Sequence, residues 1–508
     1  MRSAARLRAL ANVSALAALM GLAAPAAMAQ TIATAAAQPS GVSQEQALSL
    51  SARLDALERR NEALEAQVAD LKAQAAAGVQ QVRETAAAQP VVTIANARPT
   101  IASPDGAFRF AVRSVVQFDA ASYSETPRTA ANDLGSGTNF RRARLGIDGA
   151  AYKDWNFAIW GEFGGSGGES PALNQAYVEY AGWKPFGPDE PIRLRVGAWA
   201  TPSGLEDATS NTEALFLERP AIAELVRGLA TGDGRTGAGF TARGARWYLS
   251  GLLSGKVVGV PATPEFDQQA GFAARFAFNP IHGPDYDIHL GANVQGVLSP
   301  ADTTAGPVDT RAVRLQERPE LRVSGVRLVD TGAINSDGLT GYGLEAGASW
   351  RSLYLASEWY DIDVSRKPTA PATTTPFDPS FSGWYLQAAW AVTGEHHAWT
   401  NANGGFVGIR PARRFDPGRG AWGAWELATR YSVLDLNDRA GVVGSAAPAG
   451  GIRGGEQKIT TVGLNWYPNS VIRFLLDYQW TRVDRLNAAG TSIGEHVDVV
   501  SLRSQFAF

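Results

Sequence analysis

The sequence predicts an all-β fold: a sixteen-stranded antiparallel transmembrane β-barrel preceded by a short N-terminal coiled-coil helix. Three observations predict it. From residue 107 onward, apolar and polar side chains alternate along runs of about 10 to 12 residues, the length of a tilted membrane-crossing strand. Aromatic side chains gather at the ends of these runs, as they do at membrane–water interfaces. The chain also ends on such a run, whose last residue is Phe508.

The composition excludes several classes of protein. The chain has 508 residues and no cysteine, which excludes a disulfide scaffold, a cysteine-based zinc site and a thiol nucleophile. The formal net charge of −3 gives no indication of nucleic-acid binding, and we expect none. Of the 46 basic residues, 40 are arginine, the side chain that binds phosphate and carboxylate groups in a bidentate way. Genomic base composition could produce the same bias.

The N-terminus has the pattern of a secretory signal peptide over residues 1–29. A basic segment precedes the apolar stretch 9–24, and an Ala-x-Ala cleavage site ends at Ala29. The alternative is a membrane anchor, which the short apolar stretch and the well-placed cleavage site disfavour. No later stretch has 18 consecutive apolar residues, so we expect no transmembrane helix.

Residues 30–46 are predicted to form a linker, and 47–77 a coiled-coil helix. Its apolar seam has alternating spacings of four and three and consists of Leu50, Leu54, Leu57, Asn61, Leu64, Val68 and Leu71. About three heptads are not stable as a lone helix in water, so the segment predicts self-association. The alternative is an amphipathic helix lying on its own protein. Asn61 and Val68 favour two strands over three, so the helix alone does not set the copy number. Gly78 is predicted to end it, and 78–106 to be a flexible tether.

The remainder, 107–508, is predicted to be the barrel. Alternation alone fits a soluble sandwich equally well, but the strand lengths and aromatic ends favour a membrane barrel. Long Gly/Ser/Thr/Pro-rich links alternate with tight turns, as in such barrels. A sixteen-stranded barrel is wide enough for a water-filled channel. The strand-like runs are 107–119, 139–149, 154–164, 173–184, 190–199, 240–253, 269–279, 286–297, 317–329, 341–350, 352–363, 383–393, 421–435, 457–468, 470–482 and 496–508.

Five short stretches carry a resemblance to a known family. They are, in order, FRRARLGID at 140–148, NQAYVEY at 174–180, VGAWATPSGLE at 196–206, FLERP at 216–220 and NWYPN at 465–469. These stretches resemble the phosphate-selective porin O/P family of outer-membrane channels, and the resemblance covers about 107–508. It implies a homotrimer of sixteen-stranded barrels in the Gram-negative outer membrane, each with its own pore, in contact with lipid and lipopolysaccharide.

The resemblance also implies where the pore is narrowest. The link 200–239 corresponds to the third long loop, which in the family folds into the barrel and makes the constriction. It carries Arg219, Arg227 and Arg235 but no lysine, and six acids: Glu206, Asp207, Glu213, Glu218, Glu224 and Asp233. By motif position the family's basic lining includes Arg141 and Arg142, to which Arg144 adds a third arginine.

Alternation within the strands predicts which other arginines face the lumen. Arg142 and Arg144 share a face opposite Leu145, so Arg141 must lie at the rim or on a bulge. The same parity places five further arginines inward: Arg193, Arg195, Arg246, Arg275 and Arg473. A ring of guanidinium groups would attract phosphate or another anion. The alternative is that wall carboxylates neutralise these arginines, and the inward-facing candidates are Glu162, Glu179, Glu345, Glu358 and Glu426.

We therefore expect a passive channel for small hydrophilic solutes, with a preference for anions such as phosphate or polyphosphate. We expect no enzymatic activity, no cofactor and no metal: there are five histidines but no metal-binding motif. One rival is a barrel enzyme of phospholipase type, for which Ser250 and His289 share the inward parity. The other is a structural barrel that grips peptidoglycan through the coiled coil.

Overall fold

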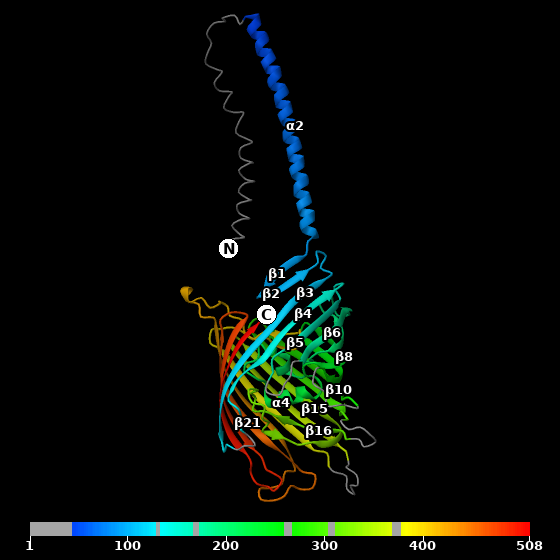
Figure 1. The fold of residues 1–508 in the computed structure, drawn as a ribbon, viewed down its shortest axis with the longest axis vertical. Helices are drawn as coiled ribbons and strands as arrows, with labels where there is room; N and C mark the ends of the chain where they lie inside the picture. Colours follow the sequence, from blue (N-terminus) through cyan, green and yellow to red (C-terminus); the bar gives the residue numbers. More distant parts are fainter. Residues whose placement is uncertain (1–42, 129–132, 166–171, 259–266, 303–309, 368–376) are drawn as a thin grey trace. The chain divides into compact units, whose positions relative to one another are not determined.

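The structure is a computed structural model, and it describes residues 43–128, 133–165, 172–258, 267–302, 310–367 and 377–508 (Figure 1). The contacts between residues divide the chain into one unit that ends at Ala88 and a second that begins at Gln89. The predicted signal peptide and most of the predicted linker lie outside the described residues. Within the described ranges, no α-helix is both long and apolar enough to cross a membrane.

The second unit is a closed antiparallel barrel, and the prediction of sixteen strands is confirmed. Each strand pairs with its neighbours along the chain, and the last strand pairs with the first, so that no barrel edge is left open. The strands are β3 (Arg109–Thr126), β4 (Gly137–Ala151), β5 (Trp155–Glu162), β6 (Ala172–Trp183), β7 (Ile192–Ala198), β8 (Arg235–Gly244), β9 (Trp247–Val257), β10 (Ala270–Gly283), β11 (Tyr286–Ser299), β15 (Ile334–Trp350), β16 (Leu353–Arg366), β17 (Ser380–Ala391), β20 (Ala424–Asp438), β21 (Ile452–Tyr467), β22 (Ile472–Asp484) and β23 (Glu495–Ala507).

Two of the sixteen predicted runs were wrong, and the errors cancel in the count. The run 240–253 is a hairpin made of β8 and β9, with only two residues between the strands. The parity of the alternation reverses at this turn, because Gly244 pairs with Trp247 and Arg243 with Tyr248. With so few residues between the strands, the reversal was missed and the two strands were read as one. The run 317–329 is not a barrel strand. It lies in the link after β11, where burial of side chains such as Leu321 and Leu328 gives it a strand-like pattern.

Connections differ in length between the two ends of the barrel. At the end where the chain terminates, which we call the short-turn end, five connections have four residues or fewer: 152–154, 245–246, 284–285, 351–352 and 468–471. At the opposite, long-link end the connections are longer, and two of them, 199–234 and 300–333, are by far the longest. The other two connections at the short-turn end are 184–191 and the much longer link 392–423.

These three long connections fold into the barrel. The link 199–234 contains α3 (Leu205–Ala208) and α4 (Ala221–Ala230), both largely buried. The link 300–333 contributes the short pieces β12 (Ala312–Val313), β13 (Gln316–Glu317) and β14 (Val329–Asp330), and the link 392–423 contributes β18 (Trp399–Thr400), β19 (Gly405–Phe406) and the single-turn η1 (Pro417–Arg419). Apolar residues of α4 pack with Leu321 and with inward-facing wall residues such as Ile362 and Phe381, forming an apolar core inside the barrel.

The walls show the alternation of a membrane barrel. On β22, Leu476 and Trp480 are exposed on the outer surface, whereas Arg473, Asp477 and Gln479 are buried on the inner one. The same pattern recurs on β16, where Leu355 and Trp359 point outward. Polar groups therefore line the interior and apolar groups the outside, as a lipid environment requires.

The segment before the barrel is more regular than predicted. Helix α2 (Gln44–Ala88) has 45 residues and continues through Gly78, because one glycine costs only about 1 kcal/mol among good helix formers. Where a tether was expected, β1 (Val91–Ala95) and β2 (Arg98–Ala102) form a hairpin that pairs with β3. Its two-residue turn, Asn96 and Ala97, has positive φ at both positions.

Candidate functional site: a charged constriction in the barrel

Two of the places at which the link 199–234 is held inside the barrel involve buried ionic groups. At the first, which we call the Glu358 anchor, the backbone N–H groups of Leu205 and Glu206 donate to the two carboxylate oxygens of Glu358, at 2.6 and 3.0 Å. The hydroxyls of Tyr360 and Tyr385 donate to the same carboxylate, each at 2.7 Å. Glu358 is 1% exposed and receives four hydrogen bonds, so the beginning of α3 is fixed on the β16–β17 wall.

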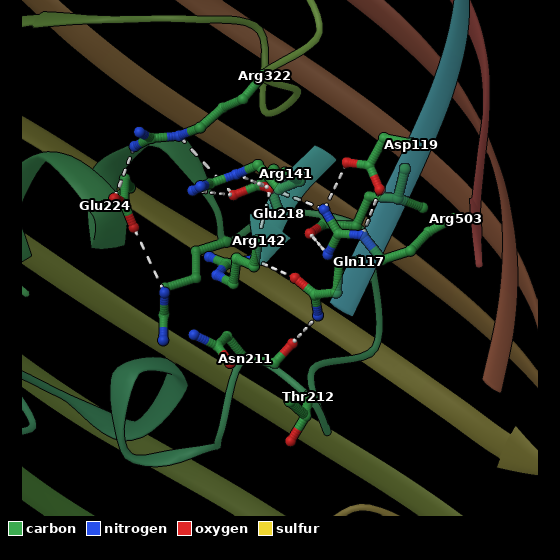
Figure 2. Close-up of polar contacts among 12 residues, drawn as sticks. Gln117, Asp119, Arg141, Arg142, Asn211, Thr212, Glu218, Glu224, Arg322 and Arg503 are labelled. Carbon is green, nitrogen blue, oxygen red and sulfur yellow. Dashed lines mark hydrogen bonds and ion pairs between the residues drawn. The ribbon is translucent and has the colours of Figure 1, made fainter. Parts of the chain in front are cut away.

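The second place is a set of charged residues around Glu218, near the start of α4 (Figure 2). Arg141 Nε donates to Glu218 Oε1 at 2.7 Å, and Arg503 Nη2 donates to the same oxygen at 2.9 Å. Arg322 Nε lies 3.8 Å from Glu218 Oε2. We call this set the Glu218 cluster; its members are Gln117, Asp119, Arg141, Arg142, Glu218, Arg322 and Arg503.

A bulge in β4 brings two consecutive arginines to the cluster. Gln117 of β3 pairs with Arg142, but the next β3 residue, Phe118, pairs with Phe140, so Arg141 is an extra residue without a partner in the ladder. Because the strand bulges there, Arg141 and Arg142 both point inward, and both are buried. The bulge expected from the sequence is therefore present.

Arg142 differs from its neighbours in the cluster. Arg503 is held by both oxygens of Asp119 at 2.7 Å, Arg322 lies 2.7 Å from Glu224, and Arg141 takes Glu218. Arg142 donates to the neutral side chain of Gln117 at 2.7 Å, and its ion-pair distance to Glu218 is 3.9 Å. Its charge is thus the least compensated of the four guanidinium groups.

Most of the other predicted arginines face inward and are paired with acids. Arg144 lies between Glu162 and Asp233, at 2.5 and 2.7 Å. Arg193 and Arg195 share Glu179, at 2.8 and 2.6 Å. These pairs correspond to the neutralised alternative that the sequence also allowed. The five wall carboxylates predicted to face inward are all inside the barrel, four of them buried and Glu162 partly so.

The loop arginines are paired within the inserted link itself. Arg219 lies 3.1 Å from Asp207, and Arg227 lies 2.7 Å from Asp207 and 2.5 Å from Asp233. Arg235, the first residue of β8, donates to the carbonyl oxygens of Gly255 and Gly228 at 3.1 and 2.8 Å.

The prediction for Arg246 was wrong. It lies in the two-residue turn between β8 and β9, exposed, and donates to the carbonyl of Pro280 at 3.3 Å. The error follows from reading the hairpin as a single strand, which placed a turn residue on the wall. Arg275 and Arg473 are on the inner wall as predicted.

Sequence reasoning missed Arg503, Arg322 and Gln117 in the Glu218 cluster. The signal for Arg503 was present, since it has the opposite parity to Leu502 and Phe506 on the last strand. Arg322 could not be found, because it comes from the link that had been assigned to the wall as a strand. Nothing in the sequence shows which of the six loop acids meets the wall.

Two acids of the link, Glu218 and Glu224, remain ionised because arginines surround them. Burial alone would raise the pKa of Glu218, but the guanidinium groups of Arg141, Arg142 and Arg503 outweigh it and hold that pKa well below its ordinary value. Burial likewise opposes ionisation of Glu224, and Arg322 and Arg227 lower its pKa to about 2. The cluster is therefore a permanent set of charges at neutral pH.

A cavity of about 1000 Å³ opens on the short-turn side of the inserted link. Residues 207–213 of the link form one side, β3 and β22 contribute Arg113 and Arg473, and the tip of the β1–β2 hairpin contributes Asn96 and Arg98. Asn96, Arg98, Arg113 and Arg473 are polar or charged, as expected for a compartment that admits water and small ions.

The residues considered for a metal site and for a hydrolase site can be placed within the described ranges. Within the described ranges, no group of three or more histidine, aspartate or glutamate side chains could hold a metal ion. Both ring nitrogens of His289 are engaged: Trp399 Nε1 donates to Nδ1 at 3.1 Å, and Nε2 lies 3.1 Å from Glu345. The imidazole is thus committed to Trp399 and Glu345 rather than to Ser250.

A family profile and a relative of known class point to the same protein family. The sequence profile of the phosphate-selective porin O and P family matches residues 110–508. Porin O of Pseudomonas aeruginosa is 24% identical over 409 residues, which are 76% of this chain and 86% of Porin O. An uncharacterized protein of Caulobacter vibrioides is 25% identical over 418 residues, 77% of this chain and 74% of that protein. Among solved structures, the anion-selective porin from Comamonas acidovorans is 12% identical with a TM-score of 0.42, covering 79% of this chain and 100% of that one.

The family match covers the whole barrel, including the strands and the inserted link that carry the Glu218 cluster. The matched relatives of known class are porins, which are channels and not enzymes. This chain belongs to the phosphate-selective porin O and P family and is an outer-membrane porin channel.

Proposed function

We propose that the channel passes small hydrophilic anions in preference to cations, and that inorganic phosphate is among its permeant ions. The observation that supports this most directly is the surplus of guanidinium over carboxylate groups in the Glu218 cluster. Four arginines of the cluster share two carboxylates, Asp119 and Glu218, with Glu224 beside Arg322. Arg142 has the neutral Gln117 as its close partner.

The charge of Arg142 sets the sign of the electrostatic potential in the lumen near the inserted link. Two unit charges roughly 4 Å apart interact by about 4 kcal/mol where the effective dielectric constant is near 20. One uncompensated guanidinium therefore favours anions in a constricted lumen. The surrounding acids keep the net positive charge small, which allows an attracted ion to leave again.

The test is the reversal potential of the purified protein in a planar bilayer under a salt gradient. We expect an anion-selective sign for the wild type. Arg142→Gln should lower the anion-to-cation permeability ratio by roughly two- to fivefold, since one charge acting across water is worth about 0.5 to 1 kcal/mol. Arg246→Gln, which removes an exposed turn arginine, is the matched control and should leave the ratio unchanged.

Two results would contradict the proposal. A cation-selective wild type would overturn anion preference altogether. An unchanged ratio in the Arg142→Gln variant, with the barrel folded, would show that the surplus charge does not control permeation. Competition between chloride and inorganic phosphate in the same bilayer decides whether phosphate is a permeant ion.

We also propose that the channel is a homo-oligomer, a trimer as the family resemblance implies, and that α2 contributes to its assembly. The apolar seam of α2 supports this: Leu50, Leu54, Leu57, Leu64 and Leu71 are each about half exposed or more in the single chain. Deletion of 44–88 should weaken or abolish the oligomer, measured as molar mass in detergent. An unchanged mass would contradict a role for α2 in assembly.

The same deletion tests whether α2 instead anchors the barrel to the cell wall. Loss of co-sedimentation with peptidoglycan, together with unchanged molar mass and conductance, would favour the anchoring role. Export through a cleavable signal peptide predicts that the mature chain starts at Gln30, which N-terminal sequencing of the membrane protein checks.

A further inference from the structure

The cavity at the short-turn end carries a surplus of positive charge among the described residues. Seven arginines line it: Arg98, Arg113, Arg144, Arg219, Arg227, Arg410 and Arg473. The carboxylates that pair with them are six: Asp148, Glu162, Asp207, Glu213, Glu224 and Asp233. Six of the seven arginines take part in these pairs, and Arg473 does not.

Arg473 is the exception in detail. In the part of the chain that the structure describes, no carboxylate oxygen lies within 4.0 Å of its guanidinium group. Nη2 reaches only the carbonyl oxygen of Leu215, at 3.5 Å, and the buried Nε has no hydrogen-bond partner. The guanidinium stands 4.7 Å from the ring centre of Tyr467. Arg473 is 3% exposed, so this charge is both buried and poorly satisfied.

The two carboxylates described next each have a contact other than Arg473. Glu213 holds Arg410 at 2.5 Å and accepts the N–H of Gly408 at 3.2 Å. Asp477, on the same strand as Arg473, accepts the N–H of Leu217 at 2.9 Å.

Glu426 is held by other groups. His397 Nε2 lies 2.6 Å from Glu426 Oε1. Asn465 and the Tyr467 hydroxyl donate to Glu426 Oε2 at 3.2 and 2.7 Å. Among the described residues, Glu426 makes no ion pair with Arg473 within 4.0 Å.

We propose that Arg473 is a binding position for the phosphate or carboxylate group of a solute that occupies the short-turn-end cavity. The inference rests on the proposed anion preference and adds a second position to the Glu218 cluster. A guanidinium group presents paired N–H donors to a planar or tetrahedral oxyanion. A mobile anion supplies the negative charge that no neighbouring side chain in the described ranges provides. Binding stays reversible because the cavity is open to water.

The row of side chains around Arg473 is suited to this use. Its partner across the strands is Gln505, which also lines the cavity. Gln505 donates to the carbonyl oxygen of Thr212 in the inserted link at 2.8 Å and accepts from Gln117 Nε2 at 2.6 Å. Gln117 in turn accepts from Arg142. Hydrogen bonds thus run from Arg142 through Gln117 to Gln505, the strand neighbour of Arg473, between the Glu218 cluster and the cavity.

The experiment measures block of the chloride current by inorganic phosphate, using the full-length protein in planar bilayers. For Arg473→Gln we expect the half-blocking phosphate concentration to rise about tenfold, which corresponds to about 1.4 kcal/mol. Arg473→Lys keeps the charge but loses the fork of donors and should fall between wild type and Arg473→Gln. Arg246→Gln is the control and should match wild type. Acetate in place of phosphate tests the carboxylate arm.

The outcomes separate this inference from the proposed function. Unchanged phosphate block in Arg473→Gln, with an anion-selective wild type, overturns the Arg473 position and leaves anion preference standing. A cation-selective wild type overturns both. Heat-dependent migration on a gel reports whether each variant forms the barrel. If Arg473→Gln does not, the lysine variant decides, because wild-type block in that variant contradicts bidentate binding.

Discussion

The two attachments of the inserted link use opposite chemistry. At the Glu358 anchor, a wall carboxylate accepts backbone N–H groups from the start of α3, supported by two tyrosine hydroxyls. At the Glu218 cluster, the link supplies the carboxylate and the wall supplies the guanidinium groups, while Arg430 and Arg503 also donate to carbonyl oxygens of Glu218 and Leu217. The acceptor belongs to the wall in one case and to the link in the other.

The difference separates positioning from charge control. At the Glu358 anchor one carboxyl group accepts hydrogen bonds from neutral donors, so that attachment depends on hydrogen-bond geometry. The Glu218 cluster depends on a balance among several charges, and a change of one charge alters both the attachment and the field in the lumen. Substitutions at the two places should therefore differ in kind as well as in size.

The largest effect is expected for Glu218→Gln. The substitution preserves shape but leaves Arg141, Arg503 and Arg142 without their shared carboxylate, and removing one partner of a buried pair typically costs about 3 to 5 kcal/mol. We expect a lower resistance to urea unfolding, followed by tryptophan fluorescence, and a higher anion-to-cation permeability ratio. Loss of stability with a lower ratio would contradict the assignment of Glu218 as the counter-charge.

A smaller effect is expected for Glu358→Gln. The amide retains one acceptor oxygen for the four donors, and a hydrogen bond to a charged group contributes about 1.5 to 3 kcal/mol. The beginning of α3 should loosen, which limited proteolysis of the link 199–234 would detect. Because this carboxyl group lies outside the Glu218 cluster, the permeability ratio should change less than in Glu218→Gln. An equal change would show that the two attachments are not independent.

The smallest effect is expected between pH 8 and pH 5. The pKa of Glu224 is lowered to about 2, and that of Glu218 lies well below its ordinary value. For carboxyl groups whose pKa is lowered by folding, the stabilisation is present above the unfolded pKa of about 4.5 and is lost as the pH falls toward the folded pKa. The contribution of these two carboxylates to selectivity and urea resistance should thus be constant to pH 5 and decline only below about pH 4. Comparing wild type with Glu218→Gln at each pH isolates that contribution, and its loss already near pH 6 would contradict these shifts.

The sequence predicted what depends on alternation and failed where the chain leaves the wall. The inward placement of Arg144, Arg195 and Arg473 follows from the period of two, which the lipid environment enforces. The strand predicted at 317–329 is wrong because a buried segment inside the barrel is as apolar as a strand. The partners of the arginines could not be predicted either, since Glu218 and Asp119 meet Arg503 only after the barrel has closed.

The bulge in β4 has a consequence for how such a pore could be retuned. In a regular strand only every second side chain points into the lumen, which limits the number of charges that a stretch of wall can carry. The extra residue Arg141 adds one inward-pointing charge beyond that limit without enlarging the barrel. Deleting this single residue would restore a regular ladder at the expense of one positive charge, whereas an insertion elsewhere would create a new doublet. Indels within strands, usually regarded as damaging, could therefore alter the conductance of this architecture in discrete steps.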